Sequence, residues 1–362
     1  MDDRSDRRSV VNRAQSPDGR PSMAQVAAHA KVSHQTVSRV VNGATGVKPA
    51  TRERVEAAIR ELGYRRNNAA RTLVTSRSGL IGVIAVGSFL YGPTRTLAGI
   101  EEAARSHDFT TLLATIRSGG DGELSEQFER AIDTCLDRSV EAIIVIAAQE
   151  DVVRQVPMFA VDVPLIVVGP PQSHLPGLST FSVDQRQGAK DAIAHLGELG
   201  HRRILVLTGP GRWIDAQERR TGALDECEAR GIAAEVVAGD WSPASGYEAG
   251  RALADRADGV PTAIFSANDA MALGLLAAFN EAGVTVPDDV SLIGFDDIPE
   301  AAYFSPALTT VHQDFTTLGH RVLEAAAALI GGQEPDMSAV PPVLLVRSST
   351  AQPPEQAREK KR

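Results

Sequence analysis

Short apolar runs alternate with alanine-rich helical patterns from residue 80 onward, and this alternation is the feature that most limits the fold. The runs are, in order, LIGVIAV, TLLATI, EAIIVIAA, VPLIVVG, RILVLTG, AEVVAGD, TAIFSAN and SLIGFDD. Continuously apolar strands separated by helices predict parallel sheets that are covered on both faces. Because a typical sheet holds about 4–6 strands, we expect more than one sheet in this part of the chain.

The start of the chain predicts helices instead of strands. Ser22, with Gln25 three residues later, forms a capping box, and a first helix is expected over residues 23–29. After a short turn, Ser33 caps a second helix, which is expected to end near residues 42–43. The apolar residues of these helices recur at helical spacing and are Val26, Ala27, Ala30, Val37, Val40 and Val41.

A third helix is expected to begin at Pro49 and to stop at Gly63. Its inward-facing residues are Val55, Ala58, Ile59 and Leu62. Two helices joined by a tight turn and braced by a third form a helix-turn-helix, which places its second helix in the major groove of DNA. The alternative is an ordinary pair of amphipathic helices in a small bundle, with polar side chains that only face solvent.

The net charge of −9 combines two oppositely charged parts. Up to residue 77 the chain holds 15 Lys and Arg against 7 Asp and Glu, whereas the remainder holds 22 against 39. The first part therefore carries +8 and the second −17, which indicates that only the first part meets a polyanion. Residues 1–20 lack apolar periodicity and are expected to form a disordered tail.

The polar face of the second helix carries donors that suit base edges. His34, Gln35 and Arg39 point outward, and Gln suits adenine whereas Arg suits guanine. Together with the positive charge, this face predicts sequence-specific binding to double-stranded DNA.

The stretches MAQVAAHAKVSHQTVSRVVNG and TRERVEAAIRELGY closely resemble the DNA-binding headpiece of the LacI/GalR family of bacterial repressors. The resemblance extends from Ser22 to about Ala351, and the motifs ANDAMALG and SLIGFDD are specific in combination. Three positions depart from the family pattern: Lys31 replaces the usual Gly, Lys48 a common capping Ser, and Arg66 a Pro that often precedes the hinge.

The resemblance implies a headpiece over residues 21–64, a hinge helix over 65–78, an effector-binding and dimerisation domain over 79–351, and a tail over 352–362. In this family a hinge leucine wedges into the minor groove at the operator centre, and Leu73 matches it, which implies a flexible central step such as CpG. The alternative for residues 67–79 is a plain linker. The expected contacts to a pseudo-palindromic operator are Ser33, His34, Gln35, Thr36, Ser38, Arg39, Asn42, Asn67, Ala70 and Leu73.

For the body, the resemblance implies an α/β fold with two doubly wound lobes, like a periplasmic sugar-binding protein, and chain crossings near residues 184, 311 and 341. Ligands of such folds lie at the carboxyl ends of strands, in the cleft between lobes. Polar residues that follow the strands could bind vicinal hydroxyls, and Trp241 could face the apolar side of a pyranose. The expected contacts to a small sugar or glycoside are Arg219, Trp241, Asn268, Asp296 and Phe315.

One departure leaves the identity of the sugar open. Gly169 stands where a sugar-responsive member of the family carries an acidic contact. A galactoside or another small glycoside is the expected effector. A repressor that the sugar releases from DNA is the main expectation, and a regulator that the sugar activates is the alternative.

Enzymes and transport receptors form the rival classes. LTGPGRWI lacks the third glycine of a dinucleotide loop, the histidines form no HExxH, and no serine nucleophile elbow is present. Cys135 and Cys227 have no metal-ligand neighbours and are expected to be reduced core thiols. We therefore expect no catalytic residue, cofactor or metal site.

The sequence also predicts where the protein acts and how it assembles. No apolar run reaches the roughly 18 residues of a membrane span, and the N-terminus lacks a signal-peptide core, so a cytoplasmic, nucleoid-associated protein is expected. The family reads pseudo-palindromes as dimers. Because the tail AQPPEQAREKKR has no leucine heptads, a homodimer is expected.

Overall fold

The computed structural model describes residues 21–41, 44–64, 77–87, 90–116, 121–147, 149–156, 161–170, 178–257 and 259–354. The chain forms two compact units, residues 1–78 and residues 79–362. The expected tail over 1–20, the end of the second helix at 42–43, hinge residues 65–76 and the terminal residues 355–362 lie outside the described residues.

The first unit contains three helices, α1 (Met23–Ala30), α2 (His34–Val41) and α3 (Pro49–Leu62). The capping box is present, because Ser22 N donates to Gln25 Oε1 at 2.7 Å and Gln25 N donates to Ser22 Oγ at 3.3 Å. Ser33 Oγ accepts from Thr36 N at 3.1 Å and so caps α2. The three helices enclose a small apolar core that includes Val26, Val37, Val40, Val55 and Ala58. The predicted helix-turn-helix is confirmed.

Two departures from the family pattern have visible consequences in this unit. Lys31 ends α1 in the left-handed conformation with φ 52°, a region in which a Cβ is unfavourable and glycine is free of strain. Its N–H donates to the carbonyls of Ala27 and Ala28. Lys48 provides no side-chain cap for α3, which begins with Pro49.

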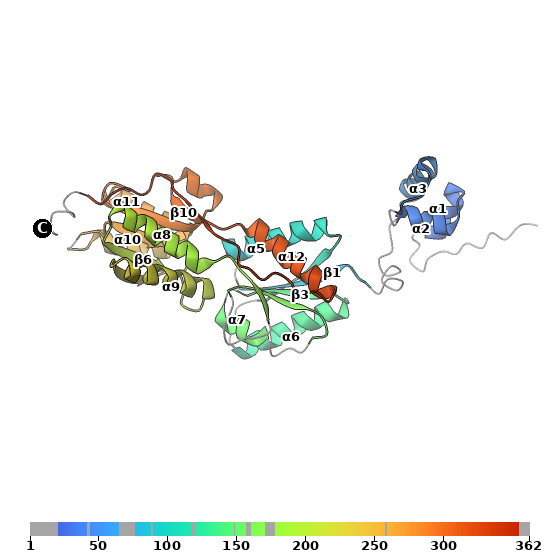
Figure 1. Ribbon diagram of the computed structural model, residues 1–362, viewed down its shortest axis with the longest axis horizontal. Helices are drawn as coiled ribbons and strands as arrows, with labels where there is room; N and C mark the ends of the chain where they lie inside the picture. Colours follow the sequence, from blue (N-terminus) through green and yellow to red (C-terminus); the bar gives the residue numbers. More distant parts are fainter. Residues whose placement is uncertain are drawn as a thin grey trace, which may run out of the picture. The chain divides into compact units, whose positions relative to one another are not determined.

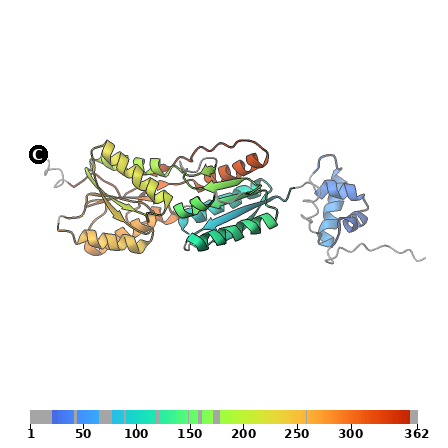
Figure 2. The same cartoon turned by 90° about the horizontal axis from the view of Figure 1, so that it is seen from below.

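The second unit contains two sheets that form an N-terminal lobe and a C-terminal lobe (Figures 1 and 2). The N-terminal lobe has five parallel strands in the order β2-β1-β3-β4-β5. Helices α5 and α12 cover one face of this sheet, and α6 and α7 cover the other. The elements are β1 (Leu80–Val86), α5 (Tyr91–Ser106), β2 (Thr110–Ile116), α6 (Asp121–Asp137), β3 (Ala142–Ile146), α7 (Glu150–Gln155), β4 (Leu165–Val168), β5 (Ser179–Phe181) and α12 (Phe315–Ile330).

The C-terminal lobe has six strands in the order β7-β6-β8-β9-β10-β11. Helices α8 and α9 pack on one face and α10 and α11 on the other. All neighbours are parallel except β10 and β11. The elements are α8 (Gln185–Leu199), β6 (Arg203–Thr208), α9 (Ile214–Ala229), β7 (Ala233–Ala238), α10 (Pro243–Ala254), β8 (Ala263–Ser266), α11 (Asp269–Ala282), β9 (Ser291–Asp296), the 3-10 helix η2 (Pro299–Tyr303), β10 (Thr309–His312) and β11 (Val343–Leu345).

The chain passes between the lobes three times. It leaves the N-terminal sheet after β5 and enters α8 at Gln185, returns after β10 to begin α12 at Phe315, and crosses again beyond Val340, which pairs with Val183. Helix α12 therefore belongs to the N-terminal lobe, where it packs along α5 (Figure 1). Within each lobe the first five strands share one doubly wound order, which directs the carboxyl ends of the strands toward a ligand crevice.

The predicted α/β body with two doubly wound lobes is confirmed, and all eight predicted strands are present. Strands β5, β10 and β11 are only three or four residues long and were not predicted from their sequence pattern. The expectation of purely parallel sheets is wrong at β11, which is an antiparallel edge strand. No helix in the described part of the chain is long and apolar enough to cross a membrane.

Candidate functional site

The surface of α2 carries the predicted base-reading side chains. His34, Gln35 and Arg39 are exposed, whereas Val37 and Val40 of the same helix are buried. Such a face leaves donors free to reach base edges while the apolar side anchors the helix.

The other predicted DNA contacts are placed differently or lie outside the described residues. Ser33 is exposed, but its hydroxyl caps α2 and lies 2.9 Å from the hydroxyl of Thr36. Thr36 and Ser38 are half-buried. The predicted contacts for which the structure describes no position are Asn42, Asn67, Ala70 and Leu73.

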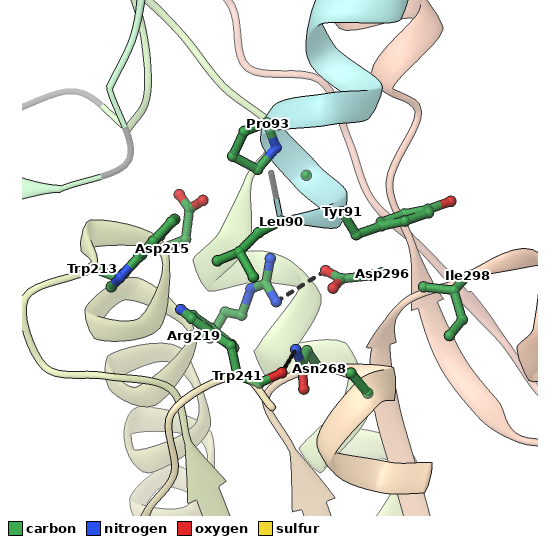
Figure 3. A pocket seen from close by; sticks show the side chains of 12 residues that line it. Leu90, Tyr91, Pro93, Trp213, Asp215, Arg219, Trp241, Asn268, Asp296 and Ile298 are labelled. Atoms are coloured by element: carbon green, nitrogen blue, oxygen red, sulfur yellow. Dashed lines mark hydrogen bonds and ion pairs between the residues drawn. The ribbon is translucent and has the colours of Figure 1, made fainter. Parts of the chain in front are cut away.

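A cavity that is open to solvent lies between the lobes, at the carboxyl ends of both sheets (Figure 3). It brings together four of the five residues predicted from the sequence: Arg219, Trp241, Asn268 and Asp296. We call this cavity the first chamber, and its lining residues are Leu90, Tyr91, Gly92, Pro93, Trp213, Asp215, Arg219, Trp241, Asn268, Ala270, Asp296 and Ile298. The N-terminal lobe contributes the start of α5, and the C-terminal lobe contributes the rest.

Arg219, on α9, is the central cation of the first chamber (Figure 3). Its guanidinium lies 3.1 Å from Asp296 Oδ1 and donates to the Ala267 carbonyl at 2.5 Å. It also lies 3.8 Å from the centroid of the Phe295 ring and 5.4 Å from that of Trp241. Since Arg219 is only 4% exposed, these partners are what make its burial tolerable.

A closed ring of hydrogen bonds surrounds this ion pair. Arg219 Nε donates to Gln185 Oε1 at 2.8 Å, and Gln185 Nε2 donates to Gln313 Oε1 at 2.7 Å. Gln313 Nε2 then donates to Asp296 Oδ1 at 2.7 Å, which returns to Arg219. All four side chains are buried. Because Gln185 and Gln313 lie at two of the chain crossings, the ring links the chamber to the segments between the lobes.

Burial controls the protonation of Asp296. It raises the pKa of Asp296 to about 6, although the neighbouring guanidinium of Arg219 acts in the opposite direction. The Asp296 carboxylate uses Oδ1 for both of its contacts to described residues, so Oδ2 accepts no hydrogen bond from that part of the chain. An acceptor of this kind suits a ligand hydroxyl.

Trp241 is held in an uncommon backbone conformation, with φ 75°, and Asp296 has φ 106°. Left-handed φ values at bulky residues cost about 1–3 kcal/mol each and concentrate at functional sites. Gly209 makes room for the indole, because a Cβ at this glycine would lie 2.3 Å from the Trp241 ring. The Trp241 indole Nε1 is buried and finds no hydrogen-bond partner among the described residues. A ligand oxygen could accept this hydrogen bond.

Two of the predicted effector contacts are placed differently from Arg219 and Asp296. Asn268 Oδ1 accepts from Met271 N at 2.9 Å and caps α11, while its Nδ2 donates to the Trp241 carbonyl at 3.0 Å. Asn268 thus positions Trp241. Phe315 lies outside the first chamber, against Tyr91, with the ring centroids 6.0 Å apart.

Several residues of the site were missed from the sequence. Asp215 and Trp213 line the first chamber, and the Trp213 and Trp241 rings meet edge to face with centroids 6.2 Å apart. Both residues follow the GPG sequence that comes after β6. Their position shortly after the end of a strand was the feature of the sequence that could have identified them as site residues. In the described part of the chain, no group of His, Cys, Asp and Glu could hold a metal ion.

Comparisons with known proteins agree with both units. Residues 22–67 match the family model of bacterial regulatory proteins, lacI family, and residues 193–350 match that of a periplasmic binding protein-like domain. The lactose operon repressor of Escherichia coli is 33% identical over 91% of this chain and 90% of its own length. The regulator CelR of Thermobifida fusca is 33% identical over 91% of this chain and 98% of its own.

Solved structures lead to the same family. A Lac repressor dimer bound to operator and the anti-inducer ONPF has a TM-score of 0.77 and 31% identity, covering 92% of this chain and 99% of that chain. A CelR–cellobiose complex has a TM-score of 0.65 and 30% identity, covering 91% of this chain and 100% of that chain. The chain belongs to the lacI family of bacterial regulatory proteins, which are DNA-binding transcriptional regulators.

Proposed function

We propose that this regulator is a homodimeric repressor that binds a pseudo-palindromic operator and is released by a small, neutral sugar. The observation that carries the proposal is the first chamber. It combines aromatic walls, a buried Arg219–Asp296 pair and free hydrogen-bonding atoms on the same chain as an exposed reading helix. Concave sites with aromatic walls and few polar groups are typical of small-molecule binding.

On the DNA side, we assign base reading to Gln35 and Arg39, with Leu73 as the wedge at the operator centre. The assignment of Leu73 is supported by the family alone, since it lies outside the described residues. A side-chain wedge unstacks a base step and kinks the duplex. Leu73→Ala should therefore abolish most operator bending in a circular-permutation assay while effector affinity stays unchanged. An undiminished bend would return residues 67–79 to the role of a plain linker.

On the effector side, Arg219, Asp296 and Trp241 would contact the sugar, with Asn268 holding Trp241 in place. The complex of CelR with cellobiose supports a sugar as the ligand class. A ligand changes operator affinity only through its different affinities for the two lobe arrangements, and coupling of about 1–3 kcal/mol is usual.

The test is an operator titration with and without each member of a sugar panel, alongside calorimetry of the same sugars. Asp296→Ala should lose the effector response and keep wild-type operator affinity. Asp225→Ala is the matched control, because Asp225 is a half-exposed partner of Arg186 on the same lobe. A sugar that tightens operator binding would make the protein sugar-activated, and a panel without any binder would contradict the sugar assignment.

We further assign the protein to the cytoplasm, near the nucleoid, and assign no catalysis to its cleft. This rests on its relatives, which are named as regulators and repressors. The absence of catalysis is tested by incubating the protein with each sugar that binds and analysing the products. Turnover of any sugar would contradict this assignment.

A further inference from the structure

The cleft continues beyond the first chamber into a second, smaller cavity that is also open to solvent. We call it the second chamber, and its lining residues are Gly92, Pro93, Thr96, Ile146, Val168, Gly169, Ser182, Val183, Gln185, Asp215, Phe315 and Leu318. Gly92, Pro93 and Asp215 line both chambers, so the two cavities adjoin at these residues. Of these three residues, Asp215 alone carries a polar side chain.

The polar groups of the second chamber are positioned for a ligand. Thr96 is 3% exposed and Ser182 is 8% exposed, yet neither hydroxyl has a hydrogen-bond partner among the described residues. Hydroxyl groups that line a chamber and have no protein partner can both donate to and accept from a ligand there. Apolar contacts come from Phe315 and Leu318. At Gly169 the wall consists of backbone, and a side chain is not tolerated there, because a Cβ would lie 2.7 Å from the Ala147 carbonyl oxygen.

Asp215 occupies the junction between the chambers. Figure 3 shows it on the opposite side of Arg219 from Tyr91. Burial raises its pKa, and no described residue forms a hydrogen bond or ion pair with it. A carboxylate in this position can accept hydroxyl hydrogens from a ligand that passes from one chamber into the other.

Charge decides which ligands fit. Arg219 is the only Lys or Arg that lines either chamber in the described part of the chain, and its guanidinium is already bound to Asp296, Gln185 and Ala267. Asp215 and Asp296 face the same space. A phosphorylated or acidic sugar would meet two carboxyl groups without a free cation, which is unfavourable in a buried site.

We propose that the effector is a neutral disaccharide that occupies both chambers. One ring packs against Trp241 in the first chamber, Asp215 accepts hydroxyl hydrogens near the glycosidic linkage, and the second ring bonds to Thr96 and Ser182. This inference rests on the proposed function, since it specifies the ligand of the same site.

The test is calorimetry of the full-length dimer with a hexose, its methyl glycoside, gluco- and galacto-configured disaccharides, an aryl glycoside and a hexose phosphate. We expect one disaccharide to bind at least about tenfold more tightly than its parent hexose, which corresponds to about 1.4 kcal/mol. The hexose phosphate should not bind. A hexose or an aryl glycoside that binds as tightly as every disaccharide would overturn the proposal.

Variants of the second chamber separate this proposal from the proposed function. Thr96→Val and Ser182→Ala should each weaken disaccharide binding about tenfold and leave hexose binding unchanged. Thr134→Val is the matched control, because the Thr134 hydroxyl is exposed and donates to the Arg130 carbonyl. Unchanged disaccharide affinity in both variants would refute the second subsite. If no sugar alters operator affinity, the proposed function itself fails.

Discussion

Gln185 Nε2 donates a hydrogen bond of 2.7 Å to Gln313 Oε1, and so joins two segments that lie 128 residues apart in sequence. Each segment is a crossing between the lobes, and each glutamine also bonds to a charged residue of the first chamber. A ligand that bonds to Arg219 or Asp296 therefore acts directly on the ring that links the crossings.

The first prediction concerns this ring. Gln185→Leu leaves Arg219 Nε and Gln313 Oε1 without their partner, and a buried unsatisfied group costs about 1–3 kcal/mol. We expect operator affinity to change less on effector saturation than in the wild type. Operator titrations at saturating effector measure this, because saturation removes any effect on effector affinity. Gln187→Leu is the control, since Gln187 is exposed on the same helix and its side chain bonds only to Asp191 among the described residues. An unchanged response in Gln185→Leu would contradict the prediction.

The second prediction is a pH dependence of effector binding. The pKa of Asp296 is raised to about 6, so its carboxyl is ionised above this value and takes up a proton below it. Because hydroxyls donate more strongly to an ionised carboxylate, effector affinity should fall as the pH is lowered through about 6. Calorimetry between about pH 5 and pH 8 measures the effect. The charged or titratable groups that act on Asp296 are Arg219, Asp215, Asp269 and Tyr91.

The stability of the ligand-free protein should follow the opposite trend. Folding raises the pKa of Asp296 above 3.8, so its contribution to stability is full below that value and is lost as the pH rises through about 6. Asp296→Asn should lower effector affinity and flatten its dependence on pH. If the same pH profile persists in Asp296→Asn, another group titrates.

The third prediction tests base reading by α2. Gln35→Ala and Arg39→Ala should each cost about 1–3 kcal/mol of operator affinity and relax specificity at one base pair. Binding titrations with operators substituted at single positions measure this. Arg54→Ala, an exposed arginine on α3, is the control and should leave sequence preference unchanged. If Gln35→Ala or Arg39→Ala weakens binding to random DNA as much as binding to the operator, the assignment is refuted.

The fourth prediction concerns the backbone of the headpiece. Lys31→Gly should stabilise the first unit by about 1 kcal/mol, because a left-handed residue is freed of its Cβ. Gly63→Ala should destabilise this unit, because it adds a Cβ to a residue with φ 64°. The added Cβ would meet no atom within 4 Å, so the effect reports the backbone conformation alone. Thermal unfolding of the headpiece transition measures both. Destabilisation by Lys31→Gly would show that its side chain contributes more than the strain costs.

The fifth prediction addresses the homodimer. Tyr303 is 88% exposed and Leu273 is 41% exposed, and their elements are tied by a hydrogen bond from Ile298 N to Asp269 Oδ2. Large exposed apolar side chains often mark interfaces. Leu273→Asp and Tyr303→Asp should weaken dimerisation in sedimentation equilibrium, whereas Val236→Asp, on the edge strand β7, should not. If both variants have the dimer dissociation constant of the wild type, the interface lies elsewhere.

The sequence predicted those parts of the fold that depend on local patterns. The caps at Ser22 and Ser33 and the buried strands β1, β3 and β9 follow from spacing and apolarity within a few residues. The site was harder to predict, because Gln185 and Gln313 meet only after the lobes have formed. Residue type also left Asn268 ambiguous, since an asparagine after a strand suits both a helix cap and a ligand contact.

Helix α12 has a consequence for the order in which the protein matures on the ribosome. It covers one face of the N-terminal sheet, with Leu318, Val322 and Leu323 in that core, yet it is synthesised after β6 to β10. The N-terminal lobe thus stays without this cover until the C-terminal lobe is almost complete. Domains usually fold in the order of their synthesis. Here the contiguous helix-turn-helix can fold first, whereas the N-terminal lobe, which follows it in sequence, completes its core last.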